Sequence, residues 1–283
     1  MSETVSHSFE HLPPGAAGLG HVFARPKVVA GLCVIVLAGL GWFYLALLFA
    51  GTATGRLGLL QALCRPLQDG SLTMRGVGIV ASMWCAMTLA MMLPSAAPMI
   101  LTYTEIADTA ARKGEHIISP FVLTVGYASV WIGFSFAATL MQFVVMQAGL
   151  LDAGMTSTSG LFSGAILVLA GVYQFSALKH ACLTHCRQPF PFFFTNWSTT
   201  RAGVFKLGLK QGLYCLGCCW AMMLVMFAAG VMNIVWMAAL GIVMTIEKML
   251  PGRRFTYGVG VVLMALGTAV VLAALASQWP MRS

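Results

Sequence analysis

The sequence predicts an all-α fold, a polytopic bundle of transmembrane helices with about seven spans and a cytoplasmic N-terminus. Of its 283 residues, 59% are hydrophobic and only 8% are charged, and the mean hydropathy is +0.87. Soluble domains carry roughly 25% charged residues, so this chain has too little charge to cover a soluble exterior. The hydrophobic residues also form runs of about 20, the length that crosses a hydrocarbon core of about 30 Å.

These runs define one transmembrane domain, residues 28–276, between a disordered cytoplasmic tail of residues 1–27 and a short tail of residues 277–283. Helices are predicted because lipid offers no hydrogen-bond partner to an unpaired backbone group. The seven predicted spans are residues 28–50, 77–101, 121–146, 161–178, 212–231, 233–250 and 257–276.

Local features refine several of these spans. The first run follows Arg25 and Lys27 and is longer than the 7–15 apolar residues of a cleavable signal, which indicates a retained anchor helix. Pro94 and Pro98 each remove a backbone donor, so we expect a kink in the second span. Only a turn near Asn233 separates the fifth and sixth spans, which predicts a tight helical hairpin.

The connection of residues 179–211 contains an aromatic run, residues 190–194, followed by Trp197. Aromatic rings settle at the headgroup level of a bilayer. We therefore expect a short interfacial or re-entrant segment there.

Lysine and arginine are unequally divided between the two sides of the predicted bundle. Twelve lie in the N-terminal tail and the connections on its side, against four on the other side. Because positively charged loops stay inside, this imbalance puts the N-terminus in the cytoplasm and the C-terminus outside. We interpret the net charge of +8 in the same way, and we predict no nucleic-acid partner, since no patch interleaves basic and aromatic residues.

Five of the eight cysteines form two close groups. The first group is Cys182 and Cys186 with His185 at its flank, and the second is Cys215, Cys218 and Cys219. Residues three and four apart share one face of a helix, so each group would project together, and the second continues through Met222 and Met226. Thiolates and thioethers are the ligands of soft metals, Cu(I) above all, with zinc as the alternative. The groups flank one cytoplasmic connection, where a reducing compartment disfavours structural disulfides.

The second span carries further sulfur. Met83, Met87 and Met91 form one stripe, and Cys85, Met92 and Met99 form another. Helices broken by proline often line functional cavities, so sulfur rows on the second and fifth spans would form a route for a soft metal across the bilayer.

Each of these features also has a simpler, structural explanation. Methionines fill gaps in apolar packing, and single cysteines are commonly inert, the reading adopted for Cys33, Cys64 and Cys85. Glu247 and Lys248 are expected to snorkel to the interface, with a carboxylate near the thiols as the alternative. Tyr173 and Gln174 are expected to bridge helices or support the thiols. The five clustered cysteines favour a metal site over packing.

Several of these runs resemble a family of bacterial, predicted metal-binding integral membrane proteins. The resemblance rests mainly on the Cys-Leu-Gly-Cys-Cys-Trp run of residues 215–220, preceded by Lys179, Cys182, Cys186 and Pro189. The methionine run of residues 83–94, the segment 230–237 and the pair at 247–248 add to it. The resemblance implies metal binding by a multi-pass protein of the bacterial inner (plasma) membrane, and it brings no established reaction.

The leading hypothesis is a membrane protein that binds Cu(I) for delivery, sequestration or translocation, with a metal-donor or metal-acceptor protein as partner. The alternatives are a membrane thiol–disulfide redox protein, since Cys215 and Cys218 have redox-pair spacing, or a non-catalytic assembly subunit. No catalytic residues are predicted. The absence of a phosphate-binding glycine loop argues against ATP-driven transport by this chain alone.

Overall fold

The computed structural model describes residues 26–54, 74–115, 117–151, 157–231 and 233–278. Within these ranges the regular elements are nine α-helices, and the sole strand-like feature is an isolated bridge between Leu151 and Ser157. The predicted all-α class is therefore confirmed. The predicted tail of residues 1–27, Cys64 and the end of the C-terminal tail fall almost wholly outside the described residues.

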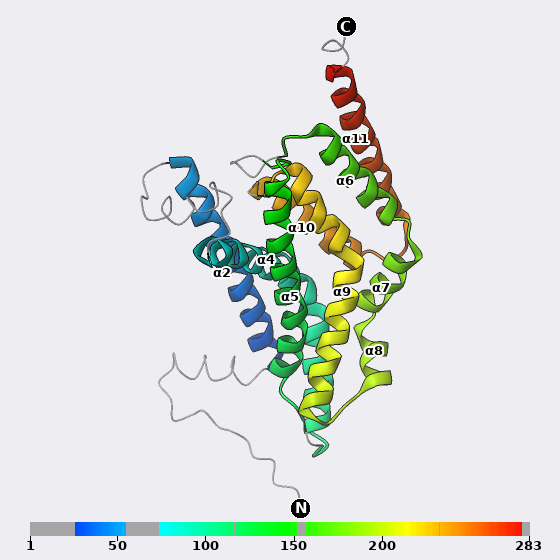
Figure 1. Cartoon of the computed structure of the whole chain (residues 1–283). Helices are drawn as coiled ribbons and strands as arrows, with labels where there is room; N and C mark the ends of the chain where they lie inside the picture. Colours follow the sequence, from blue (N-terminus) through cyan, green and yellow to red (C-terminus); the bar gives the residue numbers. More distant parts are fainter. Residues whose placement is uncertain (1–25, 55–73, 116, 152–156, 232, 279–283) are drawn as a thin grey trace, which may run out of the picture.

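Every predicted span corresponds to a helix, although several boundaries differ (Figure 1). The helices are α2 (Pro26–Thr54), α4 (Met74–Ala111), α5 (Pro120–Gln147), α6 (Gly160–Tyr173), α7 (Ala177–Arg187), α8 (Pro189–Asn196), α9 (Arg201–Ala229), α10 (Ile234–Met249) and α11 (Arg254–Gln278).

Five helices, namely α2, α4, α5, α9 and α11, are long and apolar enough to cross a membrane. A sixth crossing results if α6 and α7 count as one broken span, bent by 65°. The Ser176 side chain accepts a hydrogen bond from the Lys179 amide and starts α7 in its new direction. By length and composition, then, the described helices include five or six candidates rather than seven.

The connection of residues 179–211, expected to contain a short interfacial or re-entrant segment, is mostly helical. It holds α7, the eight-residue α8 and the first part of α9. Helix α9 begins at Arg201 instead of residue 212 because the Thr200 hydroxyl caps it, accepting from the Gly203 amide. In α8, Phe192 and Phe193 are buried while Phe190 and Phe194 are exposed.

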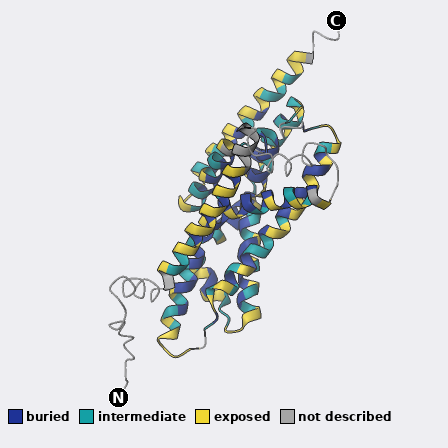
Figure 2. Ribbon diagram, turned by 90° about the vertical axis from the view of Figure 1, so that its left-hand side faces the viewer, coloured by how far each residue is buried: buried dark blue, intermediate teal, exposed yellow. Residues whose placement is uncertain are grey.

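Buried residues concentrate on the inward faces of the helices (Figure 2), and α4 and α9 are the most buried of the candidate spans, with 67% and 56% of their most apolar windows buried, against 22% for α2 and 17% for α11. Helix α5 packs along α9, α2 along α4, and α11 along α6. Helix α7 and α10 both contact α9. The buried core is thus built around the two described helices that are richest in methionine and cysteine.

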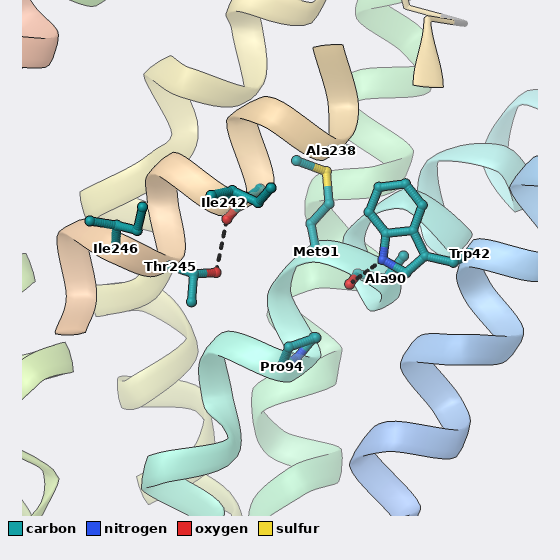
Figure 3. Close-up of a pocket in the computed structure, with 9 residues that line it drawn as sticks. Trp42, Ala90, Met91, Pro94, Ala238, Ile242, Thr245 and Ile246 are labelled. Carbon is teal, nitrogen blue, oxygen red and sulfur yellow. Dashed lines mark hydrogen bonds between the residues drawn. The ribbon is translucent and has the colours of Figure 1, made fainter. Parts of the chain in front are cut away.

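The predicted kink in α4 falls next to Pro94, where the helix axis changes direction (Figure 3). Proline has no amide to donate to the Ala90 carbonyl, one turn earlier. The indole Nε1–H of Trp42 on α2 donates to that oxygen instead, at 3.2 Å. A side chain from the neighbouring helix therefore satisfies the carbonyl that the proline leaves free.

Close packing of α5 on α9 depends on glycine. A Cβ atom on Gly126 would lie 2.3 Å from the Phe205 carbonyl oxygen, and one on Gly208 would lie 2.1 Å from the Leu123 carbonyl oxygen. Small residues let helix backbones approach each other in this way. The position of α9, and of the cysteines on it, therefore depends on these contacts.

Replacing Gly126 by alanine should destabilise the protein by about 1–3 kcal/mol, because the added methyl group forces α5 away from α9. Gly133→Ala is the matched control, since it lies on the same helix with nothing within 4 Å of the new Cβ. The control should be neutral or gain up to about 1 kcal/mol from helix propensity. Unfolding curves of the two purified variants measure the difference, and coincident curves would contradict the packing argument.

Candidate metal centre

Three cysteine sulfurs converge between α7 and α9. The Sγ atoms of Cys186, Cys215 and Cys218 all lie within 4.8 Å of one another, and those of Cys186 and Cys218 are 3.9 Å apart. Cys215 and Cys218 are only 3% and 2% exposed, whereas Cys186 is half-buried. None of the three forms a disulfide. We call these three residues the thiol triad.

The local sequence explains this convergence. Cys215 and Cys218 are three residues apart, so both project from one face of α9. Cys186 lies in the last turn of α7, which crosses that face at Gly217, where a Cβ atom would lie 2.6 Å from the Cys182 Sγ. The Tyr173 hydroxyl donates a hydrogen bond to the Gly217 carbonyl and fixes the same approach.

Two hydrogen-bonding groups surround the Cys215 sulfur. The Lys248 ammonium lies 3.0 Å from it and also contacts the Ser95 hydroxyl at 2.7 Å. The Tyr127 hydroxyl lies 3.1 Å from the same sulfur. An ammonium group at this distance favours a thiolate over a thiol, and the thiolate is the form that binds metal.

A buried ion pair joins α7 and α10, the helices that also carry Cys186 and Lys248. The Lys179 ammonium of α7 is 2.8 Å from a Glu247 carboxylate oxygen of α10, and the two side chains are 0% and 2% exposed. The Arg187 guanidinium donates to the backbone carbonyl of Glu247 at 2.9 and 2.6 Å, and to that of Gly252 at 2.8 Å. The expectation that Glu247 snorkels to the surface is therefore wrong, because Lys179 provides a buried partner. Its neighbour Lys248 turns to the thiol triad instead.

The remaining predicted thiol and imidazole groups lie outside the thiol triad. Cys219 Sγ is 3.8 Å from the Met92 Sδ on α4. Cys182 packs on Gly217, and His185 is exposed and stacks on Tyr214 with ring centroids 4.3 Å apart. The imidazole thus stacks on an aromatic ring and is not part of the cluster of three sulfurs.

The predicted methionines are buried but occupy different surroundings. Met222 Sδ accepts a hydrogen bond from the Gln174 amide at 2.9 Å, so Gln174, like Tyr173, bridges helices as predicted. Met91 lines an apolar cavity of about 320 Å³ between α2, α4 and α10, beside Trp42 and Pro94 (Figure 3). Met83, Met87 and Met226 are at most 1% exposed. No described contact joins these methionines to the thiol triad.

Sequence reasoning did not single out Tyr127 or Ser95, which complete the surroundings of the Cys215 sulfur. Tyr127 lies on α5, some 88 residues before Cys215. Neither residue stands in a metal-ligand spacing, so no local pattern marks it. Lys248 did carry a signal in the sequence, because it is a charged residue at the end of an apolar run.

Comparison with protein families relates most of the chain to a known family. A family described as PpoB2, copper chaperone, matches residues 81–270. The chain belongs to this copper chaperone family. No curated protein and no solved structure matches the chain.

The match to the copper chaperone family runs from the first third of α4 into α11 and contains the whole thiol triad and its neighbours. It supports the predicted membership of a metal-binding family. Clustered thiols are the donor set that soft metals such as copper prefer, so the site and the family agree. Helix α2 and its Trp42 lie outside the matched range.

Replacing Lys179 by methionine should destabilise the protein by about 3–5 kcal/mol, because the Glu247 carboxylate would remain buried without its partner. The double variant Lys179→Met/Glu247→Leu should recover most of this loss, since it leaves no buried charge. Equilibrium unfolding measures both. If the single and double variants unfold alike, the ion pair is not what holds α7 to α10.

Proposed function

We propose that the chain is a multi-pass membrane protein that binds Cu(I) at the thiol triad and hands it to, or receives it from, a partner protein. One observation carries the proposal, the mutual spacing of Cys186, Cys215 and Cys218. Three metal–sulfur bonds of about 2.3 Å in one plane put the sulfurs about 4.0 Å apart. The observed Cys186–Cys218 distance is 3.9 Å and all three sulfurs lie within 4.8 Å.

The donor set favours Cu(I) over zinc. Structural zinc sites are tetrahedral and take four ligands. Among the described residues the cluster offers three thiols, and the nearest imidazole in sequence, His185, faces Tyr214 instead. Cu(I) accepts lower coordination numbers and prefers soft sulfur ligands. Lys248 offsets part of the negative charge that three thiolates bring to a buried site.

A carrier must also release its metal. Two triad ligands are buried on α9, while Cys186 is half-buried and comes from the short helix α7. A partner thiol can reach Cys186 first and exchange ligands there. The buried methionines on α4 and α9 then serve as weaker, exchangeable contacts.

For the membrane part of the proposal we retain seven crossings, with the N-terminus in the cytoplasm of a bacterium and the domain of residues 28–276 in its inner membrane. Helices α5, α9 and α11 run in the same direction in Figure 1, so α6 and α10 must bring the chain back between them. Basic residues gather beside the thiols, where Lys248 contacts Cys215 and Arg187 bonds the Gly252 carbonyl. This supports access to the thiol triad from the cytoplasmic side, with Cys215 and Cys218 midway along α9.

A thiol–disulfide redox protein is the second candidate, supported by the close approach of Cys186 and Cys218. A redox pair needs two sulfurs that can join at about 2.05 Å. A redox pair does not require the third sulfur, that of Cys215, or its contact with the Lys248 ammonium. A set of metal ligands explains both features better. A non-catalytic assembly subunit with a structural metal is the remaining alternative.

Cu(I) titration of protein purified without oxygen, in competition with a chromophoric Cu(I) chelator, tests the metal site. The wild-type chain should hold copper, and Cys218→Ser should weaken it by at least about 100-fold, more than the loss of a supporting contact costs. Cys85→Ser, a half-buried thiol on α4 outside the thiol triad, is the matched control. Metal-free wild-type protein, or copper held equally by Cys218→Ser, would falsify the proposal.

Side-specific labelling tests the orientation. Lys113 and Ala148 are exposed and flank opposite ends of α5, so each can be replaced by cysteine. A membrane-impermeant maleimide added to intact cells should label Ala148→Cys, and should label Lys113→Cys only after permeabilisation; the unsubstituted chain gives the background. The reverse pattern would put the thiol triad on the outer side and revive the redox alternative.

A further inference from the structure

A second pair of soft ligands lies next to the thiol triad and deeper in the bundle. Cys219 Sγ on α9 and Met92 Sδ on α4 are 3.8 Å apart, and each residue is 1% exposed. Cys186 of the thiol triad is half-buried, whereas Cys218 and both residues of this pair are buried. The Cys219–Met92 pair also connects helices α9 and α4, whereas the thiol triad connects α9 and α7.

From this arrangement we propose that Cys219 and Met92 form a second, inner Cu(I) position, to which copper passes from the thiol triad. The inference rests on the proposed function and adds to it the direction in which copper moves. Two metal–sulfur bonds of about 2.3 Å reach between sulfurs at this separation in a bent arrangement. The three rotatable bonds of methionine allow the angle to open.

The chain holds both ligands in place. The Met92 carbonyl accepts hydrogen bonds from the Tyr127 hydroxyl at 3.2 Å and from the Ser95 hydroxyl at 2.8 Å. These bonds fix α4 immediately before the kink at Pro94. Cys219 lies one helical turn beyond Cys215 and its thiol donates to the Cys215 carbonyl at 2.8 Å. The inner pair therefore does not depend on a flexible segment.

The outer and inner positions share two supporting groups. The Tyr127 hydroxyl lies 3.1 Å from the Cys215 sulfur as well as contacting the Met92 carbonyl. Ser95 contacts both the Lys248 ammonium and the Met92 carbonyl. A copper ion that leaves Cys215 for Cys219 thus moves between sulfurs on one face of α9, within a single set of hydrogen-bonding groups.

The net charge of each copper site favours movement from the thiol triad to the inner pair. The inner pair also needs no lysine of its own to balance its charge. Cu(I) bound by three thiolates leaves two negative charges, of which Lys248 offsets one. Cu(I) bound by one thiolate and one thioether is neutral, and a neutral group is the least costly to bury. A divalent ion such as zinc at the inner pair would leave an uncompensated positive charge in the core. The inner position is therefore selective for Cu(I).

The transfer is a ligand exchange without change of oxidation state. The copper bonds to Cys186, Cys218 and finally Cys215 break as bonds to Cys219 and Met92 form. The Cys219 thiol gives its proton to one of the thiolates that copper releases, and protons from solvent neutralise the other thiolates as required. No oxidant or reductant takes part.

Copper K-edge X-ray absorption on selenomethionine-labelled, full-length protein tests the inner position, because a selenium ligand is distinguished from sulfur. We use Cys186→Ser as the background, since weakening the thiol triad shifts copper inward. A copper–selenium scattering shell is expected in this background, absent when Met92→Leu is added and retained when Met244→Leu is added. Met244 is an equally buried methionine on α10, outside both positions.

Circular dichroism of the three variants checks that each retains its helical fold. A copper–selenium shell that survives Met92→Leu, or copper bound by sulfur and oxygen ligands alone, would overturn the inner position while leaving the thiol triad intact. If the wild-type chain binds no Cu(I) in the chelator competition, the proposed function itself fails. The two failures are therefore distinguishable.

Discussion

The close approach of α7 to α9 over Gly217 sets the distance between two groups of cysteines that lie about 30 residues apart in the chain. A side chain at this position would meet the Cys182 sulfur at 2.6 Å and push the helices apart. The approach also depends on the bend after α6, which turns α7 across the face of α9, and on the buried Lys179–Glu247 pair, which joins α7 to α10. Without these three features, Cys186 would not reach Cys218.

Buried charge in an apolar bundle is costly, and the molecule has several ways of compensating it. Lys179 neutralises Glu247, and Arg187 uses its guanidinium on backbone carbonyls near the ends of α10 and α11. Lys248 has no carboxylate among its described contacts and uses a hydroxyl and a sulfur instead. A lysine directed at a cysteine is difficult to explain by packing alone, but it suits a site whose negative charge increases when thiols become thiolates.

The sequence was sufficient to predict the helical class, a helix in each predicted apolar segment, the kink at Pro94 and the shared face of Cys215 and Cys218, whereas only five or six of the seven predicted spans are candidate crossings among the described helices. These features depend on local composition and on helical periodicity. It could not predict which cysteine of α7 joins the thiol triad, because Cys182 and Cys186 lie on the same face and the docking of α7 decides between them. Glu247 was misjudged because its partner, Lys179, is 68 residues away. The start of α9 was placed too late because Arg201, Lys206 and Lys210 interrupt the apolar pattern of its first part. The helix in fact begins after the capping residue Thr200.

The thiol triad takes two ligands from α9 and one from α7, and this division has a thermodynamic consequence. A copper ion bound there would be a cross-link between two helices that are otherwise joined by van der Waals packing and a few hydrogen bonds. Any ligand that binds only the folded arrangement stabilises it by mass action, by about 1.4 kcal/mol for each tenfold excess over its dissociation constant. At a higher copper concentration in the cell, more of the protein would hold copper and more of it would have a rigid α7–α9 junction. The loaded and the empty carrier would then present different surfaces to a partner.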